Sequence, residues 1–273
     1  MCVFGTFPCA LVVNQARFML LVFSPAMIWL AAVGLFLLMR GGAVGRGLEL
    51  EMAGQPAEAE KCYRKALARS GLPASKRAEA LACLGGVLAD MGRYEESRQC
   101  LYSALAMGDP KGGCRSNIAE LLLLQGIEAE KALDMADQAL RATTTGCEKV
   151  TSTGRLGQDA VAIARASICG KRAWALARLG RQEESAHAID TSLRFAIQAS
   201  ADVLKYYSRY GRARRLARAA LGNAYWLTGM ALLAMKEGGK ASEHFQKGSD
   251  ADRSGKYGAL CRKQLALLGG PFG

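Results

Sequence analysis

Two stretches decide how this chain folds: LEMAGQPAEAEKCYRKAL at residues 50–67 and LADMGRYEESRQCLYSAL at residues 88–105. They align at an offset of 38 residues and share leucine, glycine, glutamate, cysteine and alanine at matching places. The hexapeptide at residues 92–97 recurs at residues 180–185 with five of its six residues identical. Self-similarity at a period of this size is typical of stacked helical hairpins, each too small to bury its own apolar face.

The composition agrees with an all-α fold. Apolar residues make up 51% of the 273 residues and charged residues 22%, a balance that excludes wholesale disorder. Alanine, leucine, arginine and glutamate, all good helix formers, dominate the middle of the chain. Only six prolines occur, and no long run alternates apolar and polar residues as a half-buried strand does.

The repeated stretches resemble the tetratricopeptide repeat (TPR) family, whose pattern is W-x2-L-G-x2-Y in a first helix and A-x3-F-x2-A in a second. The resemblance covers about residues 41–255. It departs from the pattern at Arg46, where leucine is usual, and at Asp109, where proline is usual. The matching positions, copy by copy, are Gly47, Leu50, Ala59, Tyr63 and Ala66; Leu81, Leu84, Gly85, Leu88, Ser97, Leu101 and Ala104; Leu122, Gly126, Ala132 and Ala136; Cys169, Ala173, Leu176, Ser185, Ile189 and Ser192; and Tyr225, Gly229, Leu232, Ala241 and Phe245.

The resemblance implies an α-solenoid of about five helical hairpins with a C-terminal capping helix. Small residues let two helices approach closely, and large ones fill the gap to the next hairpin. Gly54, Gly92 and Gly180 stand where first helices end, and glycine accepts the left-handed conformation of that cap. The expected organisation is a short segment at 1–17, a transmembrane helix at 18–39, repeats at 40–140, a loop at 141–157, further repeats with a basic segment at 158–255, and the capping helix with a tail at 256–273.

The transmembrane prediction rests on residues 18–39, FMLLVFSPAMIWLAAVGLFLLM, which contain no charge. At about 1.5 Å per residue this run spans roughly 33 Å as a helix, enough for the hydrocarbon layer of a bilayer. A cleaved signal peptide is the main alternative, but its apolar region is shorter and ends in a small-x-small site that is missing here. A buried core helix is a weaker alternative. We expect a single-pass membrane protein.

Charge and cysteine usage indicate the side of the membrane. Lysine and arginine prefer the cytoplasmic side, and more of them follow the apolar run than precede it. The nine cysteines are an odd number, so in a lone chain at least one thiol is free. No two have C-x-x-C spacing, and the two histidines lie next to no cysteine, so cysteine serves here as a small apolar residue in a reducing compartment. We expect the repeat domain on the cytoplasmic side.

The stretch KYYSRYGRARRLAR at residues 205–218 concentrates the positive charge of a chain whose net charge is +12. Three interpretations stay open: a long helix with a solvated basic face, a surface for an acidic protein or anionic lipid, and a surface for nucleic acid, which is the least favoured. The basic side chains are Lys205, Arg209, Arg212, Arg214, Arg215 and Arg218.

The family resemblance also implies a partner-binding groove, because ligand contacts in this family come from the first helix of each repeat. On this sequence that face would hold Asn117, Glu120, Lys171, Trp174, Arg178 and Trp226. The two tryptophans fit the core equally well. The lysine–asparagine clamp that some chaperone-binding members use for a terminal carboxylate is absent, because Ala82 and Gly86 occupy those places.

Catalytic and cofactor chemistry find little support in the sequence. Residues 41–47, GGAVGRG, lack both the preceding strand and the Gly-Lys-Ser/Thr ending of a phosphate loop, so they are interpreted as a tether. His187 and His244 fall in second-helix positions, where a surface or hydrogen-bonded structural histidine is the ordinary finding. We therefore expect no enzyme, no metal site and no cofactor.

The prediction for function is a membrane-anchored scaffold or adaptor that recruits partner proteins through its groove. The alternative is an accessory or regulatory protein, for example in envelope biogenesis, that acts through the basic segment on anionic lipid, acidic protein or nucleic acid. The sequence names no individual partner, because repeat solenoids serve many processes.

Overall fold

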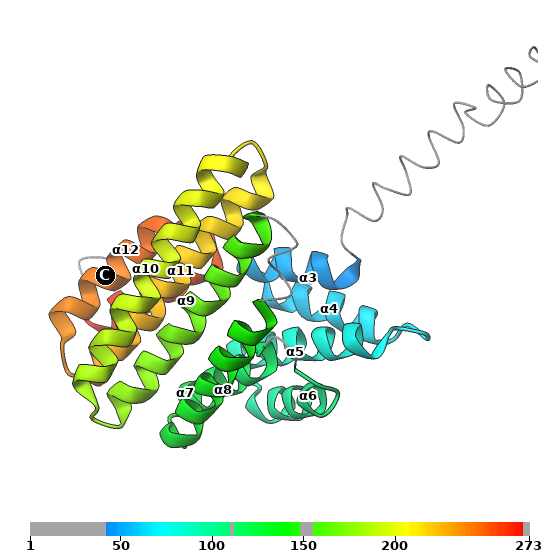
Figure 1. The fold of residues 1–273 in the computed structure, drawn as a ribbon, viewed down its shortest axis with the longest axis horizontal. Helices are drawn as coiled ribbons and strands as arrows, with labels where there is room; N and C mark the ends of the chain where they lie inside the picture. The colour runs from blue at the N-terminus through cyan, green and yellow to red at the C-terminus, as the bar shows by residue number, and fades with distance from the viewer. Residues whose placement is uncertain (1–41, 110–111, 148–154, 270–273) are drawn as a thin grey trace, which may run out of the picture.

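The computed structural model describes residues 42–109, 112–147 and 155–269, and in these ranges it contains eleven α-helices and no β-strand (Figure 1). The predicted all-α fold is confirmed. The helices are α3 (Ala43–Met52), α4 (Pro56–Leu67), α5 (Ala74–Asp90), α6 (Tyr94–Ala106), α7 (Gly113–Gln125), α8 (Ala129–Cys147), α9 (Arg155–Arg178), α10 (Gln182–Tyr207), α11 (Gly211–Ala234), α12 (Gly238–Ala251) and α13 (Lys256–Leu267).

These helices form five consecutive pairs followed by α13. Each odd-numbered helix contacts the next odd-numbered one, so α3, α5, α7, α9, α11 and α13 form one continuous layer. Each even-numbered helix contacts its partner and the helix that follows it, and so wedges between neighbouring pairs. This is the nearest-neighbour packing that defines a helical solenoid.

In several pairs the two helices meet through a small residue on the first helix and a large one on the second. A Cβ added at Gly85 would lie 2.6 Å from the Leu101 side chain, so the glycine is what allows α5 and α6 to approach. The Ser97 hydroxyl donates a 2.7 Å hydrogen bond to the Gly85 carbonyl. The Ser185 hydroxyl repeats this bond to the Ala173 carbonyl, twelve residues earlier, at 2.9 Å.

The first helices of the pairs end in a left-handed residue, as the sequence predicts. Gly92 and Gly180 both have φ of 75°, a conformation that glycine adopts without steric cost. The fifth pair has no glycine there, and Lys236 takes the left-handed conformation instead, with φ of 64°. This position stores backbone strain that the other pairs avoid.

Part of the predicted loop at 141–157 is helical in the structure, because α8 continues to Cys147 and α9 already begins at Arg155. The threonine- and glycine-rich composition indicated a loop. Thr143 lies inside α8, where its hydroxyl donates a 2.8 Å hydrogen bond back to the Ala139 carbonyl. A threonine that bonds its own helix in this way is compatible with helical structure, which the compositional rule overlooks.

The superhelical turn brings the two ends of the described chain together. Helices α11 and α13 both contact α3. Lys256 of α13 lies 2.6 Å from the Asp90 carboxylate of α5 and 3.4 Å from the Glu51 carboxylate of α3. Arg212 of α11 pairs with Glu49 of α3 at 3.3 Å. The capping helix therefore also closes the inner layer against its first member.

The apolar run at 18–39 lies outside the described residues. Within the described ranges, no helix has both the length and the apolar character that crossing a bilayer requires.

Candidate functional site: a pocket on the inner helix layer

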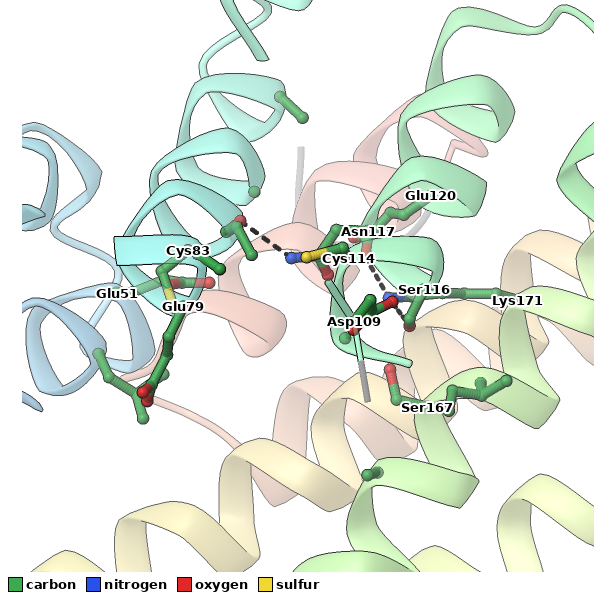
Figure 2. A pocket seen from close by; sticks show the side chains of 18 of the residues that line it. Glu51, Glu79, Cys83, Asp109, Cys114, Ser116, Asn117, Glu120, Ser167 and Lys171 are labelled. Atoms are coloured by element: carbon green, nitrogen blue, oxygen red, sulfur yellow. Dashed lines mark hydrogen bonds and ion pairs between the residues drawn. The ribbon is translucent and has the colours of Figure 1, made fainter. Parts of the chain in front are cut away.

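A pocket of about 760 Å³ opens on the inner layer of helices (Figure 2). Its walls come from α3, α5, α7, α9 and α13, together with the connection between α6 and α7. Much of the lining is apolar, from residues such as Leu48, Ala78, Met107 and Ile168. The polar lining residues are Glu51, Ser75, Lys76, Glu79, Asp90, Asp109, Ser116, Asn117, Glu120, Ser167, Lys171, Lys256 and Tyr257.

Three residues predicted for the groove line this pocket: Asn117, Glu120 and Lys171. Asn117 bridges two walls, because its side-chain amide on α7 donates a 3.1 Å hydrogen bond to the Ala82 carbonyl on α5. The amide oxygen of Asn117 is left available as an acceptor by this bond. The role of these three residues in partner binding stays a prediction.

Glu120 and Lys171 form a covered ion pair between α7 and α9, with Nζ and Oε2 2.7 Å apart. The Lys171 ammonium also donates to the Ser116 hydroxyl at 2.9 Å. Burial by itself would raise the pKa of Glu120, but the ammonium groups of Lys171 and Lys256 outweigh it and hold that pKa below its ordinary value. Glu120 therefore stays a carboxylate at neutral pH.

A second ion pair, between Asp90 and Lys256, lies near the first. The Asp90 side chain is only 15% exposed and that of Lys256 12%. Burial raises the pKa of Asp90 to about 6, and the carboxylates of Glu120 and Glu51 add to the rise, while Lys256 opposes it. The Asp90 carboxylate therefore takes up a proton at a pH well above the ordinary range of an aspartate.

The two cysteines of the lining, Cys83 and Cys114, are thiols at neutral pH. Burial raises the pKa of each to about 12. The thiolate is the nucleophilic form of cysteine, and its population is negligible at such a pKa. These side chains therefore act as small apolar wall elements (Figure 2).

The predicted groove positions of Trp174 and Trp226 are corrected by the structure. Both indoles are buried, with 4% and 3% exposure, and belong to the main hydrophobic core. Their rings meet edge to face with centroids 5.9 Å apart, a favourable aromatic arrangement. The spacing of a first helix does not distinguish its groove-facing side from its buried side, so the core interpretation, left open by the sequence, is the right one.

Arg178, the sixth predicted groove residue, lies at the end of α9 outside the pocket lining. Its guanidinium donates a 2.7 Å hydrogen bond to the Gly126 carbonyl. Gly126 follows the last residue of α7, where carbonyl groups have no partner within the helix. Arg178 therefore caps a neighbouring helix.

Sequence reasoning missed the contribution of α13 and of the end of α5. Asp90 lies one helical turn beyond Gly86, so the periodicity of the inner face could have identified it. Lys256 and Tyr257 belong to the capping helix, and no local signal reveals that this helix returns to α3 and α5. The missing information is the curvature of the solenoid.

The basic segment lies away from the pocket, at the connection between α10 and α11. All six of its basic side chains are exposed. The structure brings them together, because the end of α10 and the start of α11 are packed side by side.

Comparison with known proteins agrees with this architecture. A family model described as "Tetratrico peptide repeat" matches residues 43–151, which span α3 to α8. A search of curated proteins gave no match. The match shows that residues 43–151 belong to this repeat family, and the helix pairs from α9 to α12 repeat the same kind of serine and glycine contacts.

Proposed function

We propose that this chain is a scaffold that holds a segment of a partner protein in the inner-layer pocket, and that residues 18–39 anchor it in a membrane. The observation that supports partner binding is the position of the pocket on the concave layer of first helices, where the family fold presents a continuous surface. Tetratricopeptide repeats are a module for protein–protein interaction. The membrane anchor is supported by the uncharged apolar run of the sequence.

The charges of the pocket restrict the kind of segment that fits. The lining contains five carboxylates and three lysines. Each lysine already has an acidic partner, at 2.6 Å for Lys76 with Glu79, 2.7 Å for Lys171 with Glu120 and 2.6 Å for Lys256 with Asp90. A ligand carboxylate would meet five carboxylates, while the two covered lysines, Lys171 and Lys256, are already offset by Glu120 and Asp90. The pocket therefore favours a neutral or basic segment with small apolar side chains.

Selection of peptides tests this proposal directly. The full chain is presented to a random linear peptide library, and the selected peptides are synthesised and titrated against the wild type and two variants. Ala164 is an exposed residue of α9 that lines the pocket, so Ala164→Trp fills the space without replacing a core residue. Ala186 is an equally exposed alanine on the outer helix α10, so Ala186→Trp is the matched control.

The expected result is a neutral or basic consensus, with affinity lowered about tenfold or more by Ala164→Trp and unchanged by Ala186→Trp. Equal affinity for Ala164→Trp and the wild type would remove the pocket from the binding site. A consensus with an obligatory free C-terminal carboxylate would refute the charge argument.

A further inference from the structure

The end of the α10–α11 pair projects from the solenoid and forms a second candidate binding surface, separate from the pocket. Helix α10 has 26 residues and α11 has 24, against 17 and 13 for α5 and α6. The Ser200 hydroxyl of α10 donates a 3.0 Å hydrogen bond to the Ala217 carbonyl of α11, close to the buried Val203. Beyond this point lies the segment that we name the basic tip, residues 204–216 (Figure 1, yellow).

The basic tip carries positive charge without local compensation. Residues 204–216 contain five basic residues and no acidic one. Arg212 is paired with Glu49 of α3. Among the described residues, Lys205, Arg209, Arg214 and Arg215 have no salt bridge. These four exposed side chains lie on one short helical hairpin. Together they attract an extended negatively charged surface.

Exposed apolar and aromatic side chains accompany this charge. Leu204 is 40% exposed, Tyr206 40% and Tyr210 53%. The cationic groups lie over the tyrosine rings, with Lys205 Nζ 5.2 Å from the Tyr206 centroid and the Arg209 guanidinium 5.0 Å from that of Tyr210. Tyrosine with basic neighbours is the pairing found at the headgroup level of bilayers, where the ring is apolar and its hydroxyl is wet.

The basic tip also lies close to where the apolar run of the sequence ends. The Arg212 guanidinium lies beside the first turn of α3, since a Cβ added at Gly45 would be 3.8 Å from it. Five residues lie between Met39, the last apolar residue of the run, and Gly45, so the two are six positions apart. Even a fully extended chain of that length spans only about 20 Å. A bilayer that holds residues 18–39 is therefore within reach of the basic tip.

We propose that the basic tip is a membrane-contact surface that binds anionic phospholipid headgroups beside the N-terminal anchor. An anionic bilayer fits better than nucleic acid or an acidic protein for two reasons. The tip is the projecting end of a helix pair (Figure 1), which suits a flat surface, and a bilayer that holds residues 18–39 would lie within its reach. Two attachments, an apolar anchor and a basic tip, would fix how the repeat domain stands on the membrane. This inference does not depend on what occupies the pocket.

Residue-resolved amine labelling of the full chain in lipid nanodiscs tests the proposal. The chain is incorporated into nanodiscs of phosphatidylcholine alone or of phosphatidylcholine with phosphatidylglycerol, and acetylation of individual lysines is followed by mass spectrometry. Lys205 reports on the tip, and the exposed Lys247 of α12 is the internal reference. We expect the labelling rate of Lys205 to fall about fivefold in the anionic discs, with no change at Lys247, and to recover in high salt because exposed charges are screened.

A matched pair of triple variants controls for charge alone. Arg209→Gln, Arg214→Gln and Arg215→Gln remove three unpaired charges from the tip, and we expect them to abolish the protection of Lys205. Lys240→Gln, Arg253→Gln and Lys263→Gln remove three exposed charges elsewhere, and the protection should persist. Circular dichroism confirms that both variants keep their helices.

Three results would overturn the proposal. The first is equal labelling of Lys205 in both kinds of nanodisc. The second is protection by added RNA or polyglutamate in the absence of protection by anionic lipid. The third is failure of the full chain to enter nanodiscs of either composition, since the position of the tip at the bilayer rests on the anchor. None of these results bears on peptide binding by the pocket.

Discussion

The helix pairs from α3 to α8 and those from α9 to α12 use the same contacts at different lengths. In both regions a serine hydroxyl bonds the carbonyl twelve residues before it, as in Ser97 with Gly85 and Ser185 with Ala173. Each region has a first helix that ends at a glycine with φ of 75°, Gly92 in the first region and Gly180 in the second. The helices of the first region have 10 to 19 residues, whereas α9, α10 and α11 have 24, 26 and 24.

The difference between the regions shows that the helices of a repeat can be longer while the contacts near the turn between them stay the same. The conserved spacing around Ala173 and Ser185 lies near the α9–α10 turn, so the additional helical turns of α10 and α11 extend toward the opposite end of the pair. That end is the basic tip. The first region supplies most of the pocket wall, the second supplies the tip and the wall formed by α9, and α13 completes the pocket. The pocket and the basic tip are thus both built from the same kind of helix pair, which is short in the first region and long in the second.

The largest effect is expected when the same core position is emptied in each region. Tyr63 and Phe245 are both fully buried and each fills the space left by a glycine sixteen residues earlier. Replacing either by alanine should lower the free energy of unfolding by about 3–5 kcal/mol. Because α3 and α5 are tied to α11 and α13, both variants should shift one common transition in urea followed by circular dichroism.

The half-exposed Tyr102 provides the control, and Tyr102→Ala should cost less than about 1 kcal/mol. Two separate transitions, with Tyr63→Ala moving only one of them, would show that the regions unfold independently.

The next effect concerns the ion pair that joins the regions, and it depends on pH. The pKa of Asp90 is about 6 in the folded chain, above its ordinary value of 3.8, so the folded state prefers the protonated acid. The stability that this preference contributes is complete below pH 4 and is lost as the pH rises through 6. Asp90→Asn lacks this dependence. Relative to the wild type it should gain up to about 3 kcal/mol between pH 4 and pH 7.

Thermal unfolding midpoints across this range measure the gain. The exposed Asp190 of α10 serves as the control, and Asp190→Asn should follow the wild-type curve. Parallel curves for Asp90→Asn and the wild type would mean that Asp90 takes no part in the pH response.

The smallest expected effect concerns the left-handed residue at which a first helix ends. Lys236 occupies the left-handed position that Gly92 and Gly180 occupy in other pairs, and its side chain is exposed. Lys236→Gly should raise the free energy of unfolding by about 1 kcal/mol, because it removes the steric cost of that conformation. Lys236→Ala removes the charge but keeps the cost, so it should bring no such gain. A gain of equal size from both variants would point to charge as the cause.

The groove residues show how far the repeat pattern predicts which side of a helix a residue faces. Asn117, Glu120 and Lys171 were placed on the inner face from the repeat pattern, and they line the pocket. The same pattern placed Trp174 and Trp226 there, yet both are buried. A helix in a solenoid contacts neighbours on several sides, and a linear pattern marks apolar positions without saying which neighbour covers them.

The sequence by itself determined the helical pairs, because periodic apolar residues, small residues at close contacts and glycines at helix ends are local requirements of each hairpin. It also contains the apolar run and the cluster of basic residues. Only the tertiary structure decided that α13 returns to α3 and α5, that Lys256 finds Asp90, and that the basic tip lies beside the first turn of α3. These contacts depend on the small rotation between successive pairs, which accumulates over the whole solenoid and is encoded in no single repeat.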